Sequence, residues 1–282
     1  MEKINIAGVW VSKINMEQAV GQICTVLDQP VGDLYHVVTP NPEMVLMAQS
    51  NFSFRDVLNN ANIAVPDGVG LQMAADFIAS EVKGSQIIRF GNLLLNGMKV
   101  GIKVFTRSKY ELLPDRVAGS DLLPKILKTR PNTRVYFLGG GPNVAKLAGQ
   151  YLKEKYPNMI ISGIGEGGKI NNDGFGLDDK ETIERVSKSN TDLLVVCFGA
   201  PKQDLWINNH RDRLRVKVAI GLGGTLDYIA GVRVRPPKCL ANHGLEWIWR
   251  LLQEPSRLGR IVNATIKFPW LIARCKFDMV QS

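Results

Sequence analysis

The sequence predicts an α/β fold in which a parallel sheet is flanked by helices and followed by a basic helical appendage. Short runs that are apolar throughout alternate with longer segments of helical periodicity, and each run ends in glycine or a polar turn. Strands of this kind are typical of parallel sheets that are covered on both faces. An excess of positive charge after residue 232 predicts the appendage.

Six apolar runs are predicted to be strands, at residues 34–38, 63–65, 135–138, 159–164, 193–198 and 216–220. The first is followed by a turn with two prolines, of which Pro42 suits the first turn of a helix. The third leads through Gly139, Gly140 and Gly141 into a helix that is expected to reach about Tyr156. This repetition of strand, turn and helix predicts a Rossmann-like sheet.

Length and composition set the class of protein. The chain has 282 residues, of which 45% are hydrophobic and 22% charged, which excludes collagen-like, disordered and disulfide-scaffold proteins. We expect a core of residues 1–232, with an insertion at about residues 77–112, and an appendage of residues 233–282. No signal peptide and no membrane-spanning apolar run is apparent, so we expect a cytoplasmic protein. The four cysteines and three histidines have no metal-ligand spacing, so we expect reduced thiols, no metal and no cofactor.

The net charge of +9 arises from two segments. Residues 71–116 carry seven basic and four acidic residues, and residues 233–282 carry nine basic and three acidic ones. Both segments also contain large apolar side chains, a combination that suits an anionic membrane surface. Nucleic acid is disfavoured, because neither segment resembles a recognition helix or a zinc finger and the remainder has no basic groove. Solvated helix faces are the alternative for the first segment.

The spacing of charges in the C-terminal segment predicts an amphipathic basic helix. The basic residues on one side are Arg257, Arg260, Lys267 and Arg274, and the apolar residues on the other are Leu258, Ile261, Val262 and Ile266. Pro269 is expected to kink or end this helix.

Ligands of parallel α/β sheets bind beyond the carboxyl ends of the strands, so the loops after the predicted strands contain the candidate site residues. The Gly139 loop either lets backbone amides approach a phosphate or is a plain tight turn. Together with Glu166 after the next strand, it also fits an NAD-dependent oxidoreductase, which is the alternative function. The dinucleotide fingerprint, however, has Val144 in place of its last glycine.

Other polar loop residues each have two interpretations. Asp67 is either a reactive carboxylate in the cleft or an acid that stabilises its own turn. Asp227 either accepts ribose hydroxyls or caps a helix, and Gln203 is either a substrate contact or a solvated first-turn residue. His36 is expected to be a core residue, and no histidine has a serine or cysteine neighbour that would indicate nucleophilic catalysis.

Taken together and in this order, nine motifs resemble those of the WecG/TagA/CpsF glycosyltransferase family. They are TPNPE (39–43), VPDGVG (65–70), RVAGSD (116–121), FLG (137–139), GAPKQD (199–204), GLGGTLD (221–227), RPP (235–237), LEWIWRL (245–251) and EPSRLGR (254–260). The resemblance covers most of the chain, and ordered motifs in this number are far more specific than one glycine loop.

The resemblance implies transfer of a sugar from a UDP-sugar to a polyprenyl-diphosphate-linked saccharide at the cytoplasmic face of the membrane. This reaction belongs to cell-surface polysaccharide or teichoic acid synthesis, inverts the anomeric carbon and needs no metal. The resemblance also implies that Asp67 is the general base, with Thr39 and Arg116 beside it. The implied donor-pocket residues are Asn41, Gln203, Asp227, Gly139, Gly174 and Phe175, and the implied diphosphate contacts are Arg250, Arg257 and Arg260.

The residue types fit this chemistry. Inversion needs one base opposite the departing UDP, and a positioned carboxylate typically accelerates such a reaction by about 10²- to 10⁴-fold. No D-x-D motif occurs, so arginines, backbone amides and helix dipoles are expected to balance the charge of the diphosphate. The gap between Asp67 and Arg116 is longer than is usual in the family, and we expect it to form a hairpin that contacts the membrane or another copy. The sequence leaves the donor sugar, the acceptor and the oligomeric state open.

Overall fold

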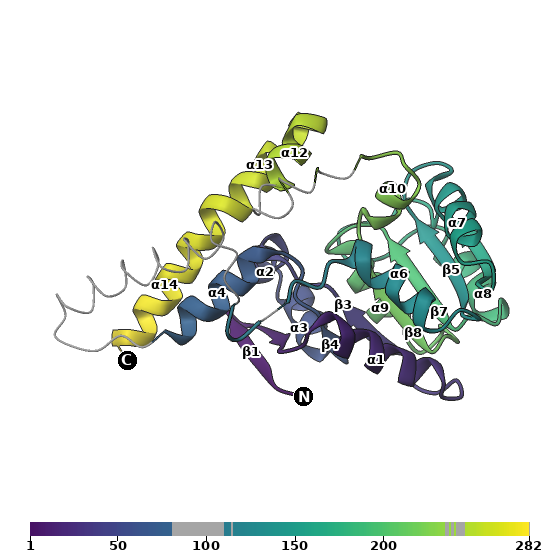
Figure 1. Cartoon of the computed structure of the whole chain (residues 1–282), viewed down its shortest axis with the longest axis horizontal. Helices are drawn as coiled ribbons and strands as arrows, with labels where there is room; N and C mark the ends of the chain where they lie inside the picture. The colour runs from purple at the N-terminus through teal and green to yellow at the C-terminus, as the bar shows by residue number, and fades with distance from the viewer. Residues whose placement is uncertain (81–109, 114, 235–236, 238–239, 241–245, 282) are drawn as a thin grey trace.

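The computed structural model describes residues 1–80, 110–113, 115–234, 237, 240 and 246–281, and it confirms the predicted fold class (Figure 1). A six-stranded parallel sheet with helices on both faces forms the core, and a helical segment near the C-terminus extends along one side (Figure 1). Most of the predicted insertion lies outside the described residues, and so does the hairpin expected there.

All six predicted strands are present, and they form one sheet in the order β4-β3-β8-β7-β5-β6. Their bounds are β3 (Tyr35–Val38), β4 (Ile63–Ala64), β5 (Arg134–Gly139), β6 (Ile160–Gly165), β7 (Leu193–Cys197) and β8 (Val218–Gly221). Every neighbouring pair is parallel, so all the carboxyl ends lie at one edge of the sheet. The order places the ends of β3, β8 and β7 next to one another.

A short antiparallel hairpin that was not predicted precedes the sheet. It consists of β1 (Lys3–Ile6) and β2 (Val9–Ser12), joined by Ala7 and Gly8. Both turn residues have positive φ, as a tight hairpin with this twist requires. The hairpin buries Ile6, Val9 and Val11 against the helices that follow β3, while Trp10 points outward.

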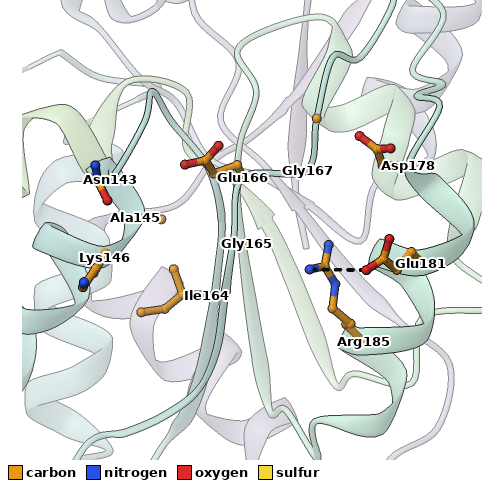
Figure 2. Close-up of a pocket in the computed structure, with 11 residues that line it drawn as sticks. Asn143, Ala145, Lys146, Ile164, Gly165, Glu166, Gly167, Asp178, Glu181 and Arg185 are labelled. Atoms are coloured by element: carbon orange, nitrogen blue, oxygen red, sulfur yellow. Dashed lines mark ion pairs between the residues drawn. The ribbon is translucent and has the colours of Figure 1, made fainter.

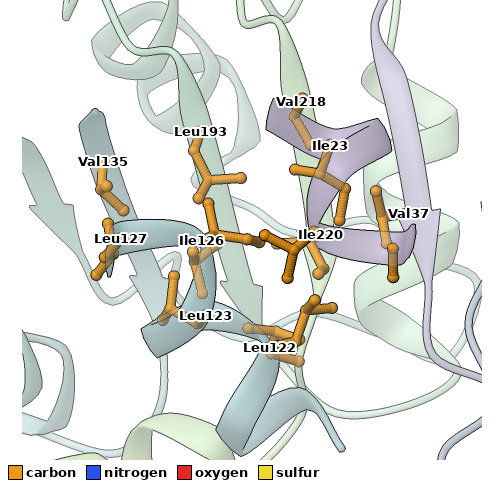
Figure 3. Close-up of a cluster of buried hydrophobic side chains, with 14 of the residues drawn as sticks. Ile23, Val37, Leu122, Leu123, Ile126, Leu127, Val135, Leu193, Val218 and Ile220 are labelled. Carbon is orange, nitrogen blue, oxygen red and sulfur yellow. The ribbon is translucent and has the colours of Figure 1, made fainter. Parts of the chain in front are cut away.

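Helices cover both faces of the sheet. Their bounds in the core are α1 (Met16–Leu27), α2 (Pro42–Ser50), α3 (Phe52–Asn60), α4 (Val69–Ala79), α6 (Gly119–Thr129), α7 (Val144–Lys155), α8 (Asp179–Lys188), α9 (Lys202–His210) and α10 (Thr225–Ile229). On one face, Leu122 and Ile126 of α6 pack with Ile23 of α1 against Ile220 of β8 (Figure 3). Buried residues of α8 and α9 cover the opposite face. Burial on both faces explains why the strands are apolar throughout.

The amino edge of the sheet is held by the buried carboxylate of Asp192, directly before β7. It accepts hydrogen bonds from the Nε and Nη2 atoms of Arg134, at 3.0 and 2.9 Å, and lies 3.2 Å from the Nζ atom of Lys217. These partners start β5 and precede β8, so one side chain ties three neighbouring strands together. Burial acts to raise the pKa of Asp192, but the hydrogen bonds from Arg134 and Lys217 outweigh it and lower the pKa.

The C-terminal segment is helical and rests on the core through its last part. It consists of α12 (Glu246–Gln253), the 3₁₀ turn η1 (Pro255–Arg257), α13 (Leu258–Val262), the π turn η2 (Asn263–Lys267) and α14 (Phe268–Gln281). In Figure 1 these elements follow one another as a rod whose α14 end lies beside α4. Phe268 and Ile272 are buried with residues of α2 and α4. Within the described residues, none of the helices combines the length and apolarity needed to cross a bilayer.

The predicted apolar side of this segment is partly wrong. Ile261 is buried as expected, but Leu258 and Ile266 are 57% and 63% exposed. The buried side continues instead through Phe268 and Ile272. A π turn at Asn263–Lys267 shifts the helical periodicity directly before Pro269, as such turns do where a helix is bent. The helix therefore does not end at Pro269 and continues to Gln281.

We predict that Asp192→Asn lowers the free energy of unfolding by about 3 kcal/mol at pH 7, because it removes a buried charge partner from Arg134 and Lys217. Chemical denaturation of the two proteins measures this difference. Since the folded-state pKa of Asp192 is lowered, its contribution is present above the unfolded pKa of about 3.9 and is lost as the pH falls through the folded value. The difference should therefore shrink in acid.

The matched control is Asp33→Asn, at an exposed position. The free energy of unfolding of this variant should differ from that of the unmodified protein by no more than roughly 0.5 kcal/mol. An Asp192→Asn protein as stable as this control would show that the sheet does not depend on the buried carboxylate.

Candidate active site

The candidate site residues lie along the carboxyl edge of the sheet, in the loops after β3, β4, β7 and β8. Neighbouring strands are only about 4.8 Å apart, so side chains from adjacent loops can act on one ligand. Three hydrogen bonds between these loops, described below, fix their relative positions. Thr39, Asn41, Asp67, Gln203 and Asp227 thus come to one edge of the sheet from segments that are far apart in the sequence.

Asp67 follows β4 in a loop that is held on two sides. Its backbone N–H donates to the carbonyl of Pro40 at 2.9 Å. On the other side Val117, which directly follows Arg116, donates its N–H to the carbonyl of Pro66 at 2.8 Å. The Asp67 Oδ1 atom lies 3.8 Å from the Nε atom of Arg116, and about one third of each side chain is exposed. The structure therefore places Arg116 beside a carboxylate that a ligand can reach.

Thr39 joins the ends of β3 and β8. Its hydroxyl donates to the carbonyl of Gly221 at 2.9 Å, and the side chain is buried. This bond spans 182 positions of sequence. Thr39 thus fixes the loop after β8, and its oxygen retains the capacity to accept a hydrogen bond.

Gln203, in the first turn of α9, fixes the same loop from the other side. Its Oε1 atom accepts a hydrogen bond from the N–H of Gly223 at 2.8 Å, and the residue is buried rather than solvated. A Cβ atom at Gly221 would lie within 3 Å of the Gln203 Nε2 and Asp204 Oδ1 atoms. A larger residue at this position would therefore displace two buried side chains.

Asp204 and His36 form a buried pair below this loop. The His36 Nε2 atom lies 3.8 Å from the Asp204 Oδ1 atom, and the two side chains are 4% and 0% exposed. Among the described residues, neither oxygen of Asp204 accepts a hydrogen bond. His36 is thus in the core, as expected, but it faces a carboxylate in the layer directly behind the site.

Asn41 and Glu43 lie at the start of α2, on the other side of Thr39. Asn41 caps the helix, because its side chain accepts a hydrogen bond from the N–H of Met44 at 3.0 Å. The Nε–H group of Arg260 donates a bifurcated hydrogen bond to the two carboxylate oxygens of Glu43, at 2.7 and 3.0 Å. The hydrogen bond from Arg260 to Glu43 raises the pKa of the guanidinium. The predicted diphosphate contact Arg260 is thereby brought to the TPNPE motif.

Asp227, at the start of α10, is also linked to the C-terminal segment. Its Oδ2 atom lies 3.5 Å from the Nε atom of Arg233, and the Nη2 atom of Arg233 lies 3.2 Å from the Oε2 atom of Glu254. Arg250 and Arg257 belong to α12 and η1, on either side of Glu254, and their side chains lie outside the described residues.

Of the glycines and the phenylalanine of the predicted donor pocket, Gly139 lies at this edge, whereas Gly174 and Phe175 lie beside the later turns of α9. Gly139 has a φ of +95°, and a Cβ atom there would lie 2.9 Å from the backbone of Cys197 at the end of β7. Gly174 has a φ of +79°, and a Cβ atom there would lie 2.6 Å from the backbone nitrogen of Trp206 in α9. Phe175 is half-exposed and packs edge-on against His210 at 5.8 Å between ring centroids.

A separate pocket of about 540 Å³ lies at the end of the edge strand β6 (Figure 2). Glu166 lies on the strand side of this pocket, facing Asn143 and Lys146 at the start of α7, and Arg185 pairs with Glu181 of α8 at 3.8 Å (Figure 2). Glu166 and the end of the Gly139 loop are therefore close, as the oxidoreductase interpretation expects. Asp67, Thr39, Gln203 and Asp227 do not line this pocket.

The arrangement can carry out acid–base chemistry on an anionic ligand. Asp67 supplies a reachable carboxylate, and Arg116, Arg233 and Arg260 supply cationic groups around it or on the adjoining segments. In the part of the chain that the structure describes, no group of three or more His, Cys, Asp or Glu side chains could hold a metal ion.

Sequence reasoning missed three residues of this edge: Glu43, Arg233 and Glu254. Glu43 lies in a quoted motif, where it reads simply as a first-turn acid that suits a helix N-terminus. Its partner Arg260 is 217 positions away, so no local pattern indicates the pair. Glu254 is the first residue of the EPSRLGR motif but has no predicted role, and Arg233 has the pattern of an ordinary surface charge.

Comparison with known proteins agrees with these observations. A family model described as "Glycosyl transferase WecG/TagA/CpsF family" matches residues 4–90 and 91–281. A protein of Staphylococcus aureus named N-acetylglucosaminyldiphosphoundecaprenol N-acetyl-beta-D-mannosaminyltransferase is 30% identical over 97% of this chain and 93% of its own length. A protein of Bacillus spizizenii with the same name is 28% identical over 85% of this chain and 78% of its own.

The matched regions include every loop that contributes to the carboxyl edge and the helical segment that Arg260 joins to it. The chain therefore belongs to the WecG/TagA/CpsF family and is a glycosyltransferase.

Proposed function

We propose that this glycosyltransferase moves a sugar from a UDP-sugar to a polyprenyl-diphosphate-linked saccharide, with inversion and without a metal. The observation that carries the proposal is the placement of Asp67, a reachable carboxylate paired with Arg116 at the carboxyl edge of the sheet. By the names of the relatives, we further propose polyprenyl-diphosphate-linked N-acetylglucosamine as the acceptor and N-acetylmannosamine as the transferred sugar.

Asp67 is proposed to be the general base. It accepts the proton of the acceptor hydroxyl as that oxygen attacks the anomeric carbon from the face opposite the leaving UDP. The backbone bond to Pro40 fixes the position of the residue, and the ion pair with Arg116 orients its carboxylate, which saves the cost of orienting it during the reaction. Thr39 supports the same region from the end of β3.

The donor is proposed to lie across the ends of β3, β7 and β8. Gln203 and Asp227 would contact the nucleotide, and Asn41 begins a helix whose N-terminus favours negative charge. Departure of UDP leaves charge on the diphosphate, and arginines are suited to it because each guanidinium donates several hydrogen bonds in a fixed plane. Arg260 is joined to the TPNPE motif by Glu43, and Arg250 and Arg257 belong to the same helical segment.

The helical segment is proposed to place the enzyme on the cytoplasmic face of an anionic membrane, where its lipid-linked acceptor is found. Its side chains Ile266, Trp270 and Phe277 are 63%, 63% and 44% exposed. Arg274 lies over the Trp270 ring at 5.7 Å. Exposed apolar side chains next to cationic groups bind lipid headgroups and the outer part of the acyl chains.

We predict that Asp67→Asn lowers the rate of transfer by about 10² or more, because an amide cannot take the proton of the acceptor. Transfer from UDP-N-acetylmannosamine to a short-chain lipid-diphosphate N-acetylglucosamine acceptor measures this loss. Calorimetry with UDP should show an almost unchanged affinity. Asp56→Asn, at an exposed position on α3, is the matched control and should keep full activity. Full activity in Asp67→Asn would eliminate it as the base.

We predict that Arg260→Gln lowers kcat/KM for the same water-soluble acceptor by roughly tenfold or more, the value of one charge-assisted hydrogen bond. A short-chain acceptor is used so that the loss cannot come from weaker membrane binding. Arg213→Gln, at an exposed position away from the site, is the control. Equal kinetics of the two variants would remove Arg260 from the site.

We predict that Trp270→Ala lowers the partition of the full chain onto vesicles of phosphatidylcholine and phosphatidylglycerol by roughly tenfold, because a large apolar side chain is lost from the membrane contact. Co-sedimentation measures the bound fraction. Trp10→Ala removes a 43% exposed tryptophan from β2 and should leave binding unchanged. If both variants sediment alike, the helical segment is not the membrane anchor.

A further inference from the structure

Arg233 lies between the sheet and the helical segment and contacts a carboxylate on each side. Its Nε atom is 3.5 Å from the Oδ2 atom of Asp227, and its Nη2 atom is 3.2 Å from the Oε2 atom of Glu254. Its backbone N–H also donates to the carbonyl of Asp227 at 3.0 Å. One side chain therefore joins the start of α10 to the residue directly after α12.

The same guanidinium lies against the loop between β8 and α10. A Cβ atom at Gly224 would lie 3.3 Å from the Asp227 Oδ2 atom and 3.7 Å from the Arg233 Nη1 atom, so the ion pair packs on the backbone of this loop. The preceding residue, Gly223, donates its N–H to Gln203. Arg233 thus contacts the loop that Gln203 and Thr39 also fix.

The next residue along the chain anchors α12. The carbonyl of Val234 accepts hydrogen bonds from the Nε1 atom of Trp249 at 3.0 Å and from the Nε2 atom of Gln253 at 2.9 Å. Together with the ion pair between Glu254 and Arg233, these bonds attach α12 to the consecutive residues Arg233 and Val234. A shift of Arg233 would therefore be transmitted to α12.

We propose that Arg233 is a positioning residue that couples occupancy of the donor site to the seating of the helical segment. The proposal rests on the proposed function, in which the nucleotide contacts Asp227. The 3.5 Å separation from Asp227 exceeds the roughly 2.7–2.9 Å of a charge-assisted hydrogen bond, so the pair can still tighten. A nucleotide that hydrogen-bonds to Asp227 fixes this carboxylate, and Arg233 then holds Glu254 and α12 in one place.

This coupling has a use in the reaction. The arginines proposed to meet the diphosphate are located on the segment that Arg233 attaches, so they would be held in place when a donor is bound. Coupling of this kind is reciprocal: loosening the contact to Glu254 must weaken nucleotide binding by the same factor by which the nucleotide strengthens the contact.

The test is calorimetric titration of the full chain with UDP, for the unmodified protein, Arg233→Gln, Glu254→Gln and the double variant. We expect Glu254→Gln alone to weaken UDP binding about fivefold. In the Arg233→Gln background the same change should have no further effect, because the two residues act through one contact. Glu184→Gln, which removes an exposed acid that pairs with Lys188, is the matched control and should bind UDP normally.

Hydrogen exchange on the same proteins gives an independent readout. UDP should slow the exchange of the α12 amides in the unmodified chain and leave it unchanged in Arg233→Gln. Arg233→Lys keeps the charge but presents a single ammonium group in place of a planar fork. This variant should fold normally and still lose the response, which separates coupling from general stability.

The outcomes distinguish this inference from the proposed function. If the unmodified chain does not bind UDP, the proposed UDP-sugar donor is wrong, and so is the proposed coupling. If UDP binds, but Glu254→Gln leaves the affinity for UDP unchanged and UDP does not slow the exchange of the α12 amides, the donor site is supported and the coupling is wrong. If Glu254→Gln weakens binding equally with and without Arg233, the coupling does not pass through this residue, and the inference is overturned.

Discussion

Parallel pairing of β3 with β8 is the constraint on which the site depends. It brings the ends of two strands that are 180 or more positions apart to the same edge, where Thr39 donates to the carbonyl of Gly221. The bond from Gly223 to Gln203 fixes the same loop against α9. With these bonds made, the loop after β8 holds Asp227 at a defined distance from Thr39, and the backbone bond from Asp67 to Pro40 adds the end of β4 to the same group.

The helical segment is joined to this edge at several points that differ in their physical nature. Phe268 and Ile272 remove apolar surface from water against α2 and α4, a contact that is not directional. Three contacts of charged groups then fix the orientation of the helical segment. Arg260 donates to Glu43, and Arg233 pairs with Glu254. The buried ammonium of Lys276 donates to the carbonyls of Ile78 and Ser80. The last contact places a cation at the C-terminus of α4, which its helix dipole favours, although burial lowers the pKa of this lysine.

Side chains of helix α4 also bind the segment of residues 110–113, which precedes Arg116. The buried carboxylate of Asp76 accepts hydrogen bonds from the N–H groups of Glu111 and Leu112, and Gln72 donates to the carbonyl of Leu113. Burial, followed in size by the charge of Asp76, raises the pKa of Tyr110 to about 12, so this residue enters the contact as a neutral phenol. Residues 110–113 are thus attached to α4 a few positions before Arg116, which helps to bring Arg116 to Asp67.

The sequence alone determined the fold class, the six strands of the sheet and the loops in which the site residues lie, because burial on both faces of a parallel sheet leaves a continuous apolar signal in each strand. It also placed Asp67, Thr39, Gln203 and Asp227 at the ends of strands. It did not determine which face of the C-terminal segment is buried, since a π turn shifts the periodicity and the partner helices choose the face. Only the tertiary structure decided that Glu43 meets Arg260 and that Arg233 lies between Asp227 and Glu254. Such pairs depend on how distant segments of the chain lie relative to one another, and the local pattern of residues does not specify that arrangement.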